Sequence, residues 1–315
     1  MRLFIKIILI ILLVVFLSTS IWFFCLRIFL ADVHFKRAIQ YQNGENWPKA
    51  LNHYNKVLFY QGYESFYQVN FAIDLRKGLD FYKNKEAKIQ IINLAINVIN
   101  KISQQDIGLK VVRDLTQIYI TKASLTQNLD DFLTADKIFQ EAIEFSPKMA
   151  GIYSDWCQLK IEQQDWQTAL EMCEKAINLY PEIKPETSGD RKVMIKTEMS
   201  GVYERIGQIY FNKENYKKSE QMYIEALRLV PIGRPNIWKK IADIYYKQGD
   251  LDTAIQRNLH GMALSPGDST WPLVIGLLYD QKDDTIEAKK YFQQVLDINP
   301  DNKIAQQFLI REGIK

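Results

Sequence analysis

The sequence has little glycine, proline and cysteine for its length. Fourteen glycines and nine prolines in 315 residues are few for an all-β protein with many turns, and they fit a protein made of long helices. The three cysteines are Cys25, Cys157 and Cys173, with no C-x-x-C spacing, which excludes a disulfide framework and a zinc site. For Cys157 and Cys173 we favour two buried thiols, and a single bond between them is the open alternative.

The sequence also lacks a strong excess of charge of either sign. The net charge is +3, with a surplus of +4 in residues 1–40 and −1 in the remainder. A near-neutral body lacks the basic surface that nucleic acid requires, so we expect no nucleic-acid partner. The composition, 47% apolar and 24% charged residues, is that of a folded protein.

Sequence motifs for catalysis and metal binding are missing. The chain contains no H-E-x-x-H, no phosphate-binding glycine-rich loop, no G-x-S-x-G and no kinase signature. The histidines, His34, His53 and His260, have no second ligand at helical spacing, so packing or surface roles are expected for them. We therefore expect no enzyme, no cofactor, no metal and no small-molecule substrate.

One long apolar run lies near the N-terminus. Residues 7–26 read IILIILLVVFLSTSIWFFCL without a charge, and as a helix they span about 30 Å, the hydrocarbon thickness of a bilayer. The competing interpretation is a cleaved signal peptide, but bulky residues follow Ser18-Thr19-Ser20 where signal peptidase needs small ones. We predict an uncleaved, single-pass membrane anchor. Basic residues on both flanks determine its orientation only weakly, and they favour the body on the extracytoplasmic side.

The rest of the chain repeats with a period of about 34 residues. Small residues recur twelve positions before a proline, at Ala135, Ala169, Ser219, Ala254 and Ala288, with a sixth copy at Ala50 that lacks the proline. When this small residue is numbered 20, positions 8, 20 and 27 are mostly small, and positions 4, 11 and 24 are often aromatic. These positions form stripes on two helices. The pattern predicts closely packed helix pairs whose stacking makes the core.

One copy carries a family resemblance along its whole length. Residues 235–268, PNIWKKIADIYYKQGDLDTAIQRNLHGMALSPGD, resemble a tetratricopeptide repeat, with typical residues at Trp238, Ile241, Ala242, Tyr245, Ala254 and Pro266. Asn258 and Gly261 depart from the usual choices of the family. The resemblance implies an all-α fold, in which one transmembrane helix precedes a right-handed superhelix of antiparallel helix pairs.

The register predicts where each segment begins and ends. The predicted segments are an anchor at 1–30, a repeat at 31–64, a degenerate repeat at 65–115, repeats at 116–149 and 150–183, an insertion loop at 184–199, repeats at 200–234, 235–268 and 269–302, and a capping helix at 303–315. Within the degenerate repeat we expect helices near 65–82 and 85–103. The insertion is interpreted as a neutral surface loop, and contact with a partner is the open alternative.

The resemblance also implies a binding surface, the concave side of the superhelix. Its candidate residues are Gln158, Glu204, Gln208, Phe211, Lys239, Asp243, Tyr246, Leu273 and Leu277. This lining lacks the Lys-and-Asn clamp with which some family members grip the C-terminal carboxylate of chaperones, so an extended peptide or loop suits it better. That these residues merely solvate the groove is the open alternative. We predict a membrane-anchored scaffold for protein–protein interaction.

A second resemblance concerns the join between the apolar run and the first repeat. The sequence LRIFLADVHFKRAIQYQNGENWPKALNHY, residues 26–54, is similar to the tail of some bacterial O-antigen ligase-like membrane proteins. It implies an alternative function, an accessory component of a cell-envelope polysaccharide assembly system. The chain lacks the many membrane helices of such a ligase, so it is not expected to perform the transfer alone.

Overall fold

The computed structural model describes residues 2–44, 46–61, 65–100, 109–184 and 187–313. Within these ranges every regular element is a helix. The helices form two compact units, Met1–Pro147 and Lys148–Lys315.

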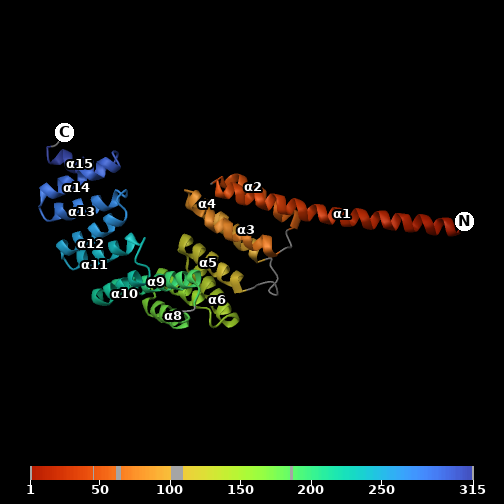
Figure 1. The fold of residues 1–315 in the computed structure, drawn as a ribbon, viewed down its shortest axis with the longest axis horizontal. Coiled ribbons are helices and arrows are strands. Elements are labelled where there is room, and N and C mark those ends of the chain that lie inside the picture. Colours follow the sequence, from red (N-terminus) through yellow and green to blue (C-terminus); the bar gives the residue numbers. More distant parts are fainter. Residues whose placement is uncertain (1, 45, 62–64, 101–108, 185–186, 314–315) are drawn as a thin grey trace. The chain divides into compact units, whose positions relative to one another are not determined.

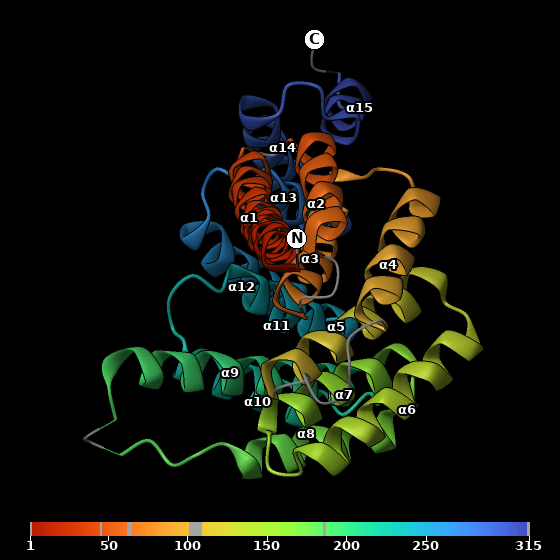
Figure 2. The ribbon, with the colours of Figure 1, turned by 90° about the vertical axis from the view of Figure 1, so that its right-hand side faces the viewer.

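The first unit consists of helix pairs in which consecutive helices pack together. The pairs are α1 (Arg2–Asn43) with α2 (Trp47–Gln61), α3 (Ser65–Lys77) with α4 (Lys85–Ile99), and α5 (Leu109–Thr126) with α6 (Leu129–Phe145); a short 3-10 turn, η1 (Gly78–Phe81), follows α3. Figure 2 looks along α1 and shows α2 beside it. The expected helix near 85–103 ends at Ile99, and residues 101–103 lie outside the described ranges.

Helix α1 runs without interruption from the apolar segment into the first helix pair (Figure 1). No glycine or proline occurs between Arg2 and Asn43 to end it. Its Ile10–Asn43 part is long and apolar enough to cross a membrane by length and composition, a test that a signal sequence near the N-terminus also passes. From Ala31 onward, side chains such as Ala38 are buried, so one rigid helix serves both segments.

The second unit stacks four helix pairs and a final helix. They are α7 (Ala150–Glu162) with α8 (Trp166–Leu179), α9 (Gly189–Asn212) with α10 (Tyr216–Leu229), α11 (Pro235–Lys247) with α12 (Leu251–Leu264), α13 (Thr270–Gln281) with α14 (Thr285–Ile298), and α15 (Lys303–Arg311). Helix α9 begins inside the predicted insertion. Helix α15 buries Ala305, Phe308 and Leu309 against α14.

The turns between paired helices in the second unit share one design. A residue with a left-handed backbone, φ between 56° and 79°, is followed by an Asp or Asn whose side chain accepts a hydrogen bond from the backbone N–H of the third residue of the next helix. The caps are Asp165, Asn215, Asp250 and Asp284. Each such cap contributes about 1 kcal/mol to helix stability, and the tight turn keeps the two helices antiparallel.

Small residues and aromatic rings interlock between helices, as the repeat pattern predicted. A Cβ atom added to Gly207 of α9 would lie 2.7 Å from Cε1 of Tyr223 of α10, closer than carbon atoms can approach. Likewise Gly261 makes room for the indole of Trp271, and Gly276 lies under the ring of Phe292. The absent side chains at Gly207 and Gly261 are therefore what let Tyr223 and Trp271 be buried, whereas at Gly276 an added Cβ atom would lie 3.3 Å from the Phe292 ring.

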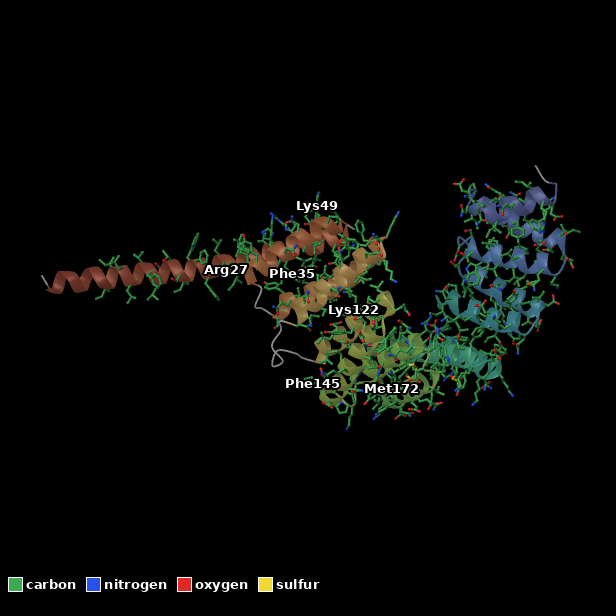
Figure 3. The ribbon with its side chains drawn as sticks, turned by 180° about the vertical axis from the view of Figure 1, so that it is seen from behind. Arg27, Phe35, Lys49, Lys122, Phe145 and Met172 are labelled. Atoms are coloured by element: carbon green, nitrogen blue, oxygen red, sulfur yellow. A yellow bond between two sulfur atoms is a disulfide. The ribbon has the colours of Figure 1, made fainter. Side chains whose placement is uncertain are left out.

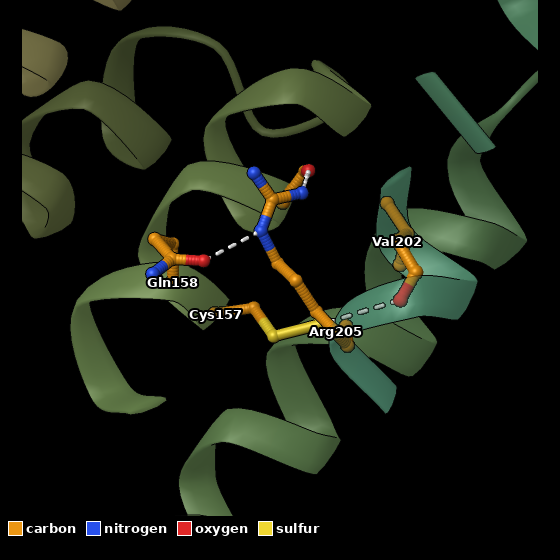
Figure 4. Close-up of a disulfide and its surroundings, with 6 residues drawn as sticks. Cys157, Gln158, Val202 and Arg205 are labelled. Carbon is orange, nitrogen blue, oxygen red and sulfur yellow. Dashed lines mark hydrogen bonds between the residues drawn. A yellow bond between two sulfur atoms is a disulfide. The ribbon is translucent and has the colours of Figure 1, made fainter. Parts of the chain in front are cut away.

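The cysteine prediction was wrong, because Cys157 and Cys173 form a disulfide (Figure 4). They occupy positions 8 and 24 of one repeat, on α7 and α8, and their Cα atoms are 5.3 Å apart. In the next repeat the same two positions hold Gly207 and Tyr223, which also touch. Two cysteines at positions that face each other across a helix pair come within bonding distance, so the single bond that was the open alternative is the one that forms.

The disulfide gives a direct test. Alkylation of the unfolded, unreduced protein should label one thiol, Cys25, and leave Cys157 and Cys173 protected, as measured by intact mass. The bond closes a loop with a sequence separation of 16, so reduction should lower the free energy of unfolding by about 3 kcal/mol. A double Cys157→Ser, Cys173→Ser variant should not respond to reductant. Three labelled thiols in the wild type would contradict the assignment.

Candidate protein-binding groove

All nine predicted groove residues are half-buried or exposed, and several of them also bond or pack within the fold. Gln158 on α7 is bound within the fold: its Oε1 accepts a hydrogen bond of 2.9 Å from Nε of Arg205 on α9, and its Nε2 donates to Oε1 of Glu162 at 3.1 Å (Figure 4). Arg205 also donates from Nη1 to Oγ of buried Ser154 at 3.1 Å. These bonds tie α7 to α9, so we assign Gln158 a structural role.

Glu204 is likewise occupied by neighbours in the chain. Its carboxylate forms ion pairs with Arg234 and with Lys240, whose Nζ lies 2.8 Å from Oε1. Burial favours the neutral carboxyl, but the hydrogen bonds and positive charges of Lys240 and Arg234 outweigh burial and lower the pKa of Glu204. Glu204 therefore joins α9 to the start of the next helix pair.

Two predicted apolar residues contribute to packing, and one amide is half-buried. The ring of Phe211 meets that of Tyr216 edge-on at 5.8 Å and packs against a buried cluster on α10 and α11. Leu273 packs against the C-terminal cluster around Phe292 and Phe308. Gln208 is half-buried on α9.

Three predicted residues, Asp243, Tyr246 and Leu277, meet in one pocket. It has a volume of about 200 Å³ and is formed by α11, α12 and α13. The other lining residues were not predicted: Ala242, Asn258, Val274, Leu278 and Gln281. Tyr246 and Leu277 are 46% and 42% exposed, so the pocket opens to solvent at its rim. A larger hollow of about 420 Å³ between α8, α9 and α10 is lined by none of the predicted residues.

Asn258 explains why a pocket is found here. It lies at repeat position 24, where Phe139, Tyr223 and Phe292 place buried rings. The asparagine is smaller than a ring, so part of the volume between helix pairs is left unfilled. The departure from aromatic character at position 24 is the sequence signal that predicts this pocket.

Asn258 also supplies the pocket with an unused hydrogen-bond acceptor. The side chain is only 2% exposed, and its Nδ2 donates to the carbonyl oxygen of Ala254 at 2.9 Å. Its Oδ1 is buried and has no hydrogen-bond partner among the residues that the structure describes. A buried acceptor without a partner costs about 1–3 kcal/mol, and a ligand with a donor group would recover that free energy.

The mouth of the pocket is mixed in charge. Asp243 is exposed at the rim, yet burial of one side of its carboxyl raises its pKa. The positive charges of Lys239, Lys240 and Lys247, all on α11, oppose that rise. Lys239 itself is exposed and does not line the pocket. Because lysines surround the single carboxylate, the site favours neutral donors over cations.

Two of the histidines that we considered singly are neighbours in the fold. Nδ1 of His34 on α1 lies 2.8 Å from Nδ1 of His53 on α2, and the rings of Tyr60 and Tyr41 stack on them. One imidazole must donate this hydrogen bond and the other must accept it. Within the described part of the chain, no group of three or more His, Cys, Asp or Glu could hold a metal ion.

Comparisons with known proteins identify the repeat. The family model for the tetratricopeptide repeat matches residues 200–231 and 273–302. These segments are tetratricopeptide repeats. The interferon-induced protein with tetratricopeptide repeats 2 of Cricetulus griseus is 27% identical over 159 residues, which are 50% of this chain and 30% of the relative. The chain thus covers less than a third of that relative's length.

Solved structures support the same fold. BtubC (BKLC) from P. vanneervenii has a TM-score of 0.52 at 17% identity, and the match covers 74% of this chain and 93% of that chain. The C-terminal part of a TPR repeat-containing protein from Cytophaga hutchinsonii has a TM-score of 0.50 at 16% identity, covering 87% and 99%. At identities this low, the similarity establishes the fold, a tetratricopeptide solenoid, and does not establish a function. Proteins with this fold are typically non-enzymatic and bind protein partners, including peptides.

The Glu204 ion pairs predict a pH dependence of stability. Because the folded pKa is lowered from its ordinary value of 4.5, the stabilisation is present above that value and is lost as the pH falls through the folded pKa. In urea unfolding at pH 7, the free energy of unfolding of Glu204→Gln should lie well below that of the wild type. The difference should shrink below about pH 4. Glu225→Gln, which removes an exposed pair with Arg228, is the control with a small effect. An unchanged difference at acid pH would reject the assignment.

Proposed function

We propose that the chain is a membrane-anchored tetratricopeptide scaffold that holds a protein partner and performs no catalysis. The partner lies in the groove as an extended segment and inserts one side chain into the pocket of Asp243, Tyr246, Asn258 and Leu277. The pocket is the observation that carries this proposal, since it combines apolar walls, an open rim and an unused acceptor.

The chemistry of the pocket defines the side chain that it takes. Leu277, Leu278 and Val274 offer apolar walls, and Oδ1 of Asn258 requires an N–H or O–H donor. The lysines near the rim disfavour a cation. A neutral donor on an apolar body, as in threonine, tyrosine or tryptophan, meets these conditions, while Tyr246 and Gln281 at the rim are available to the peptide backbone.

Two observations support placing the repeats outside the cytoplasm. Residues 7–26 anchor the chain, and the weak charge bias at their flanks favours an extracytoplasmic body. The Cys157–Cys173 disulfide fits that side, because disulfides persist in oxidising compartments and are rare in reducing ones.

The repeat boundaries and the polysaccharide alternative stay predictions. The names of the similar proteins say nothing of glycan assembly. They lend the O-antigen ligase-like interpretation no support, so the scaffold is the function that we propose.

Photo-crosslinking in the native membrane tests the proposal. A benzoylphenylalanine at Tyr246, on the pocket rim, should form a defined adduct with one partner. The same probe at Ile286, which is 82% exposed on α14 and does not line the pocket, should not. The adducts are read by denaturing electrophoresis and mass spectrometry.

The matched variant for this experiment is Asn258→Phe, which places a ring where other repeats have one. It should raise the melting temperature by filling the pocket and should remove the adduct at position 246. A stable Asn258→Phe protein that still forms the adduct would reject the pocket as the site, and equal adducts at 246 and 286 would reject specific binding in the groove.

A further inference from the structure

The end of α2 lies beside the end of the apolar segment of α1. Nη2 of Arg27 donates a hydrogen bond of 3.4 Å to the backbone carbonyl oxygen of Phe59, a residue 32 positions later. Arg27 directly follows the charge-free residues 7–26. Figure 3 shows Arg27 at the point where the part of α1 without neighbouring helices meets the rest of the first unit. Because α2 runs antiparallel to α1, its C-terminal end returns toward the level where the proposed anchor leaves the bilayer.

Exposed phenylalanines gather at this end of the first unit. Phe59 is 77% exposed, Phe66 at the start of α3 is 60% exposed, and Phe29 on α1 is 62% exposed. The Phe66 ring meets those of Phe35 and Tyr67 edge-on at 5.7 and 5.4 Å, so it is fixed in place from one side. Phe29 and Phe59 therefore expose aromatic rings close to the end of the charge-free residues 7–26, where water solvates them poorly. Phe66 lies further along, since it packs on Phe35, nine residues beyond Leu26.

The position of this surface matches the polar zone of a membrane. The headgroup region on each side of the hydrocarbon core is about 5–7 Å thick, and a helix rises about 1.5 Å per residue. The side chain of Arg27 reaches the backbone of Phe59. Phe59 therefore lies within about one headgroup thickness of the end of residues 7–26. Aromatic residues are enriched at this depth in membrane proteins, and arginine extends its charge toward the headgroups there.

We infer that Phe59 forms a second lipid contact, which together with Phe29 makes an aromatic collar around α1 in the headgroup region. The inference rests on the proposed membrane anchor. The occupant is the bilayer interface, because Arg27 holds the backbone of Phe59 beside the end of the charge-free residues 7–26, and Phe29 follows that end by three residues. The collar would hold the first helix pair upright, since the chain then touches the bilayer at two places.

Depth-dependent fluorescence quenching tests the collar on the full chain in phosphatidylcholine nanodiscs. An environment-sensitive fluorophore is attached to one thiol at a time: native Cys25, or F59C or K49C in a Cys25→Ser background. Lys49 is exposed at the opposite end of α2 from Phe59 (Figure 3), so it is the matched control. Quenching is measured with lipids that carry a nitroxide at acyl carbon 5.

Probes at 25 and 59 should shift to the blue and lose at least about half of their emission, whereas the probe at 49 should stay solvent-like. A quenched Cys25 with a solvent-like probe at 59 would overturn the collar and leave the anchor intact. An unquenched Cys25 would reject the anchor and the collar together. A blue shift at 59 without lipid quenching, accompanied by energy transfer between two labelled chains, would assign the surface to a second copy and also overturn the inference.

Discussion

The second unit depends on one kind of contact, in which a small residue on one helix packs against an aromatic ring on a neighbouring helix. Gly207 with Tyr223 and Gly276 with Phe292 show it within two helix pairs, and Gly261 with Trp271 shows it between successive pairs. Each contact lets two backbones approach while a ring fills the space beside them. Since one pair cannot bury its apolar face alone, the repeated contact also sets how the pairs stack.

The two places where this contact is replaced give the chain its individual features. In the repeat of α7 and α8, Cys157 and Cys173 replace the small residue and the ring, and the contact becomes covalent. In the repeat of α11 and α12, Asn258 replaces the ring, and a pocket with an unused acceptor results. Stability is gained at the first site, and a candidate binding site is gained at the second.

Periodicity in the sequence predicted the fold because it reports which face each residue occupies. It could not predict what lies opposite that face. Glu204 had the register of a groove residue, but its partners Arg234 and Lys240 come from the next helix pair. Asp243, Tyr246 and Leu277, which were predicted to share the concave surface, line one pocket. Asn258 was not predicted as a pocket residue, because the repeat pattern marks it as a departure from the family but does not give the volume that the missing ring leaves.

A double-mutant cycle on Gly207 and Tyr223 tests the central constraint most directly. Gly207→Val should destabilise the fold by about 3 kcal/mol through overpacking, and Tyr223→Ala by about 3–5 kcal/mol through a cavity. In the double variant the valine fills part of that cavity. The loss of unfolding free energy, measured with urea, should therefore be smaller than the sum of the two single losses by more than about 1 kcal/mol. Losses that add to within about 0.5 kcal/mol would show that the two residues do not interlock, and the account of the repeat would be contradicted.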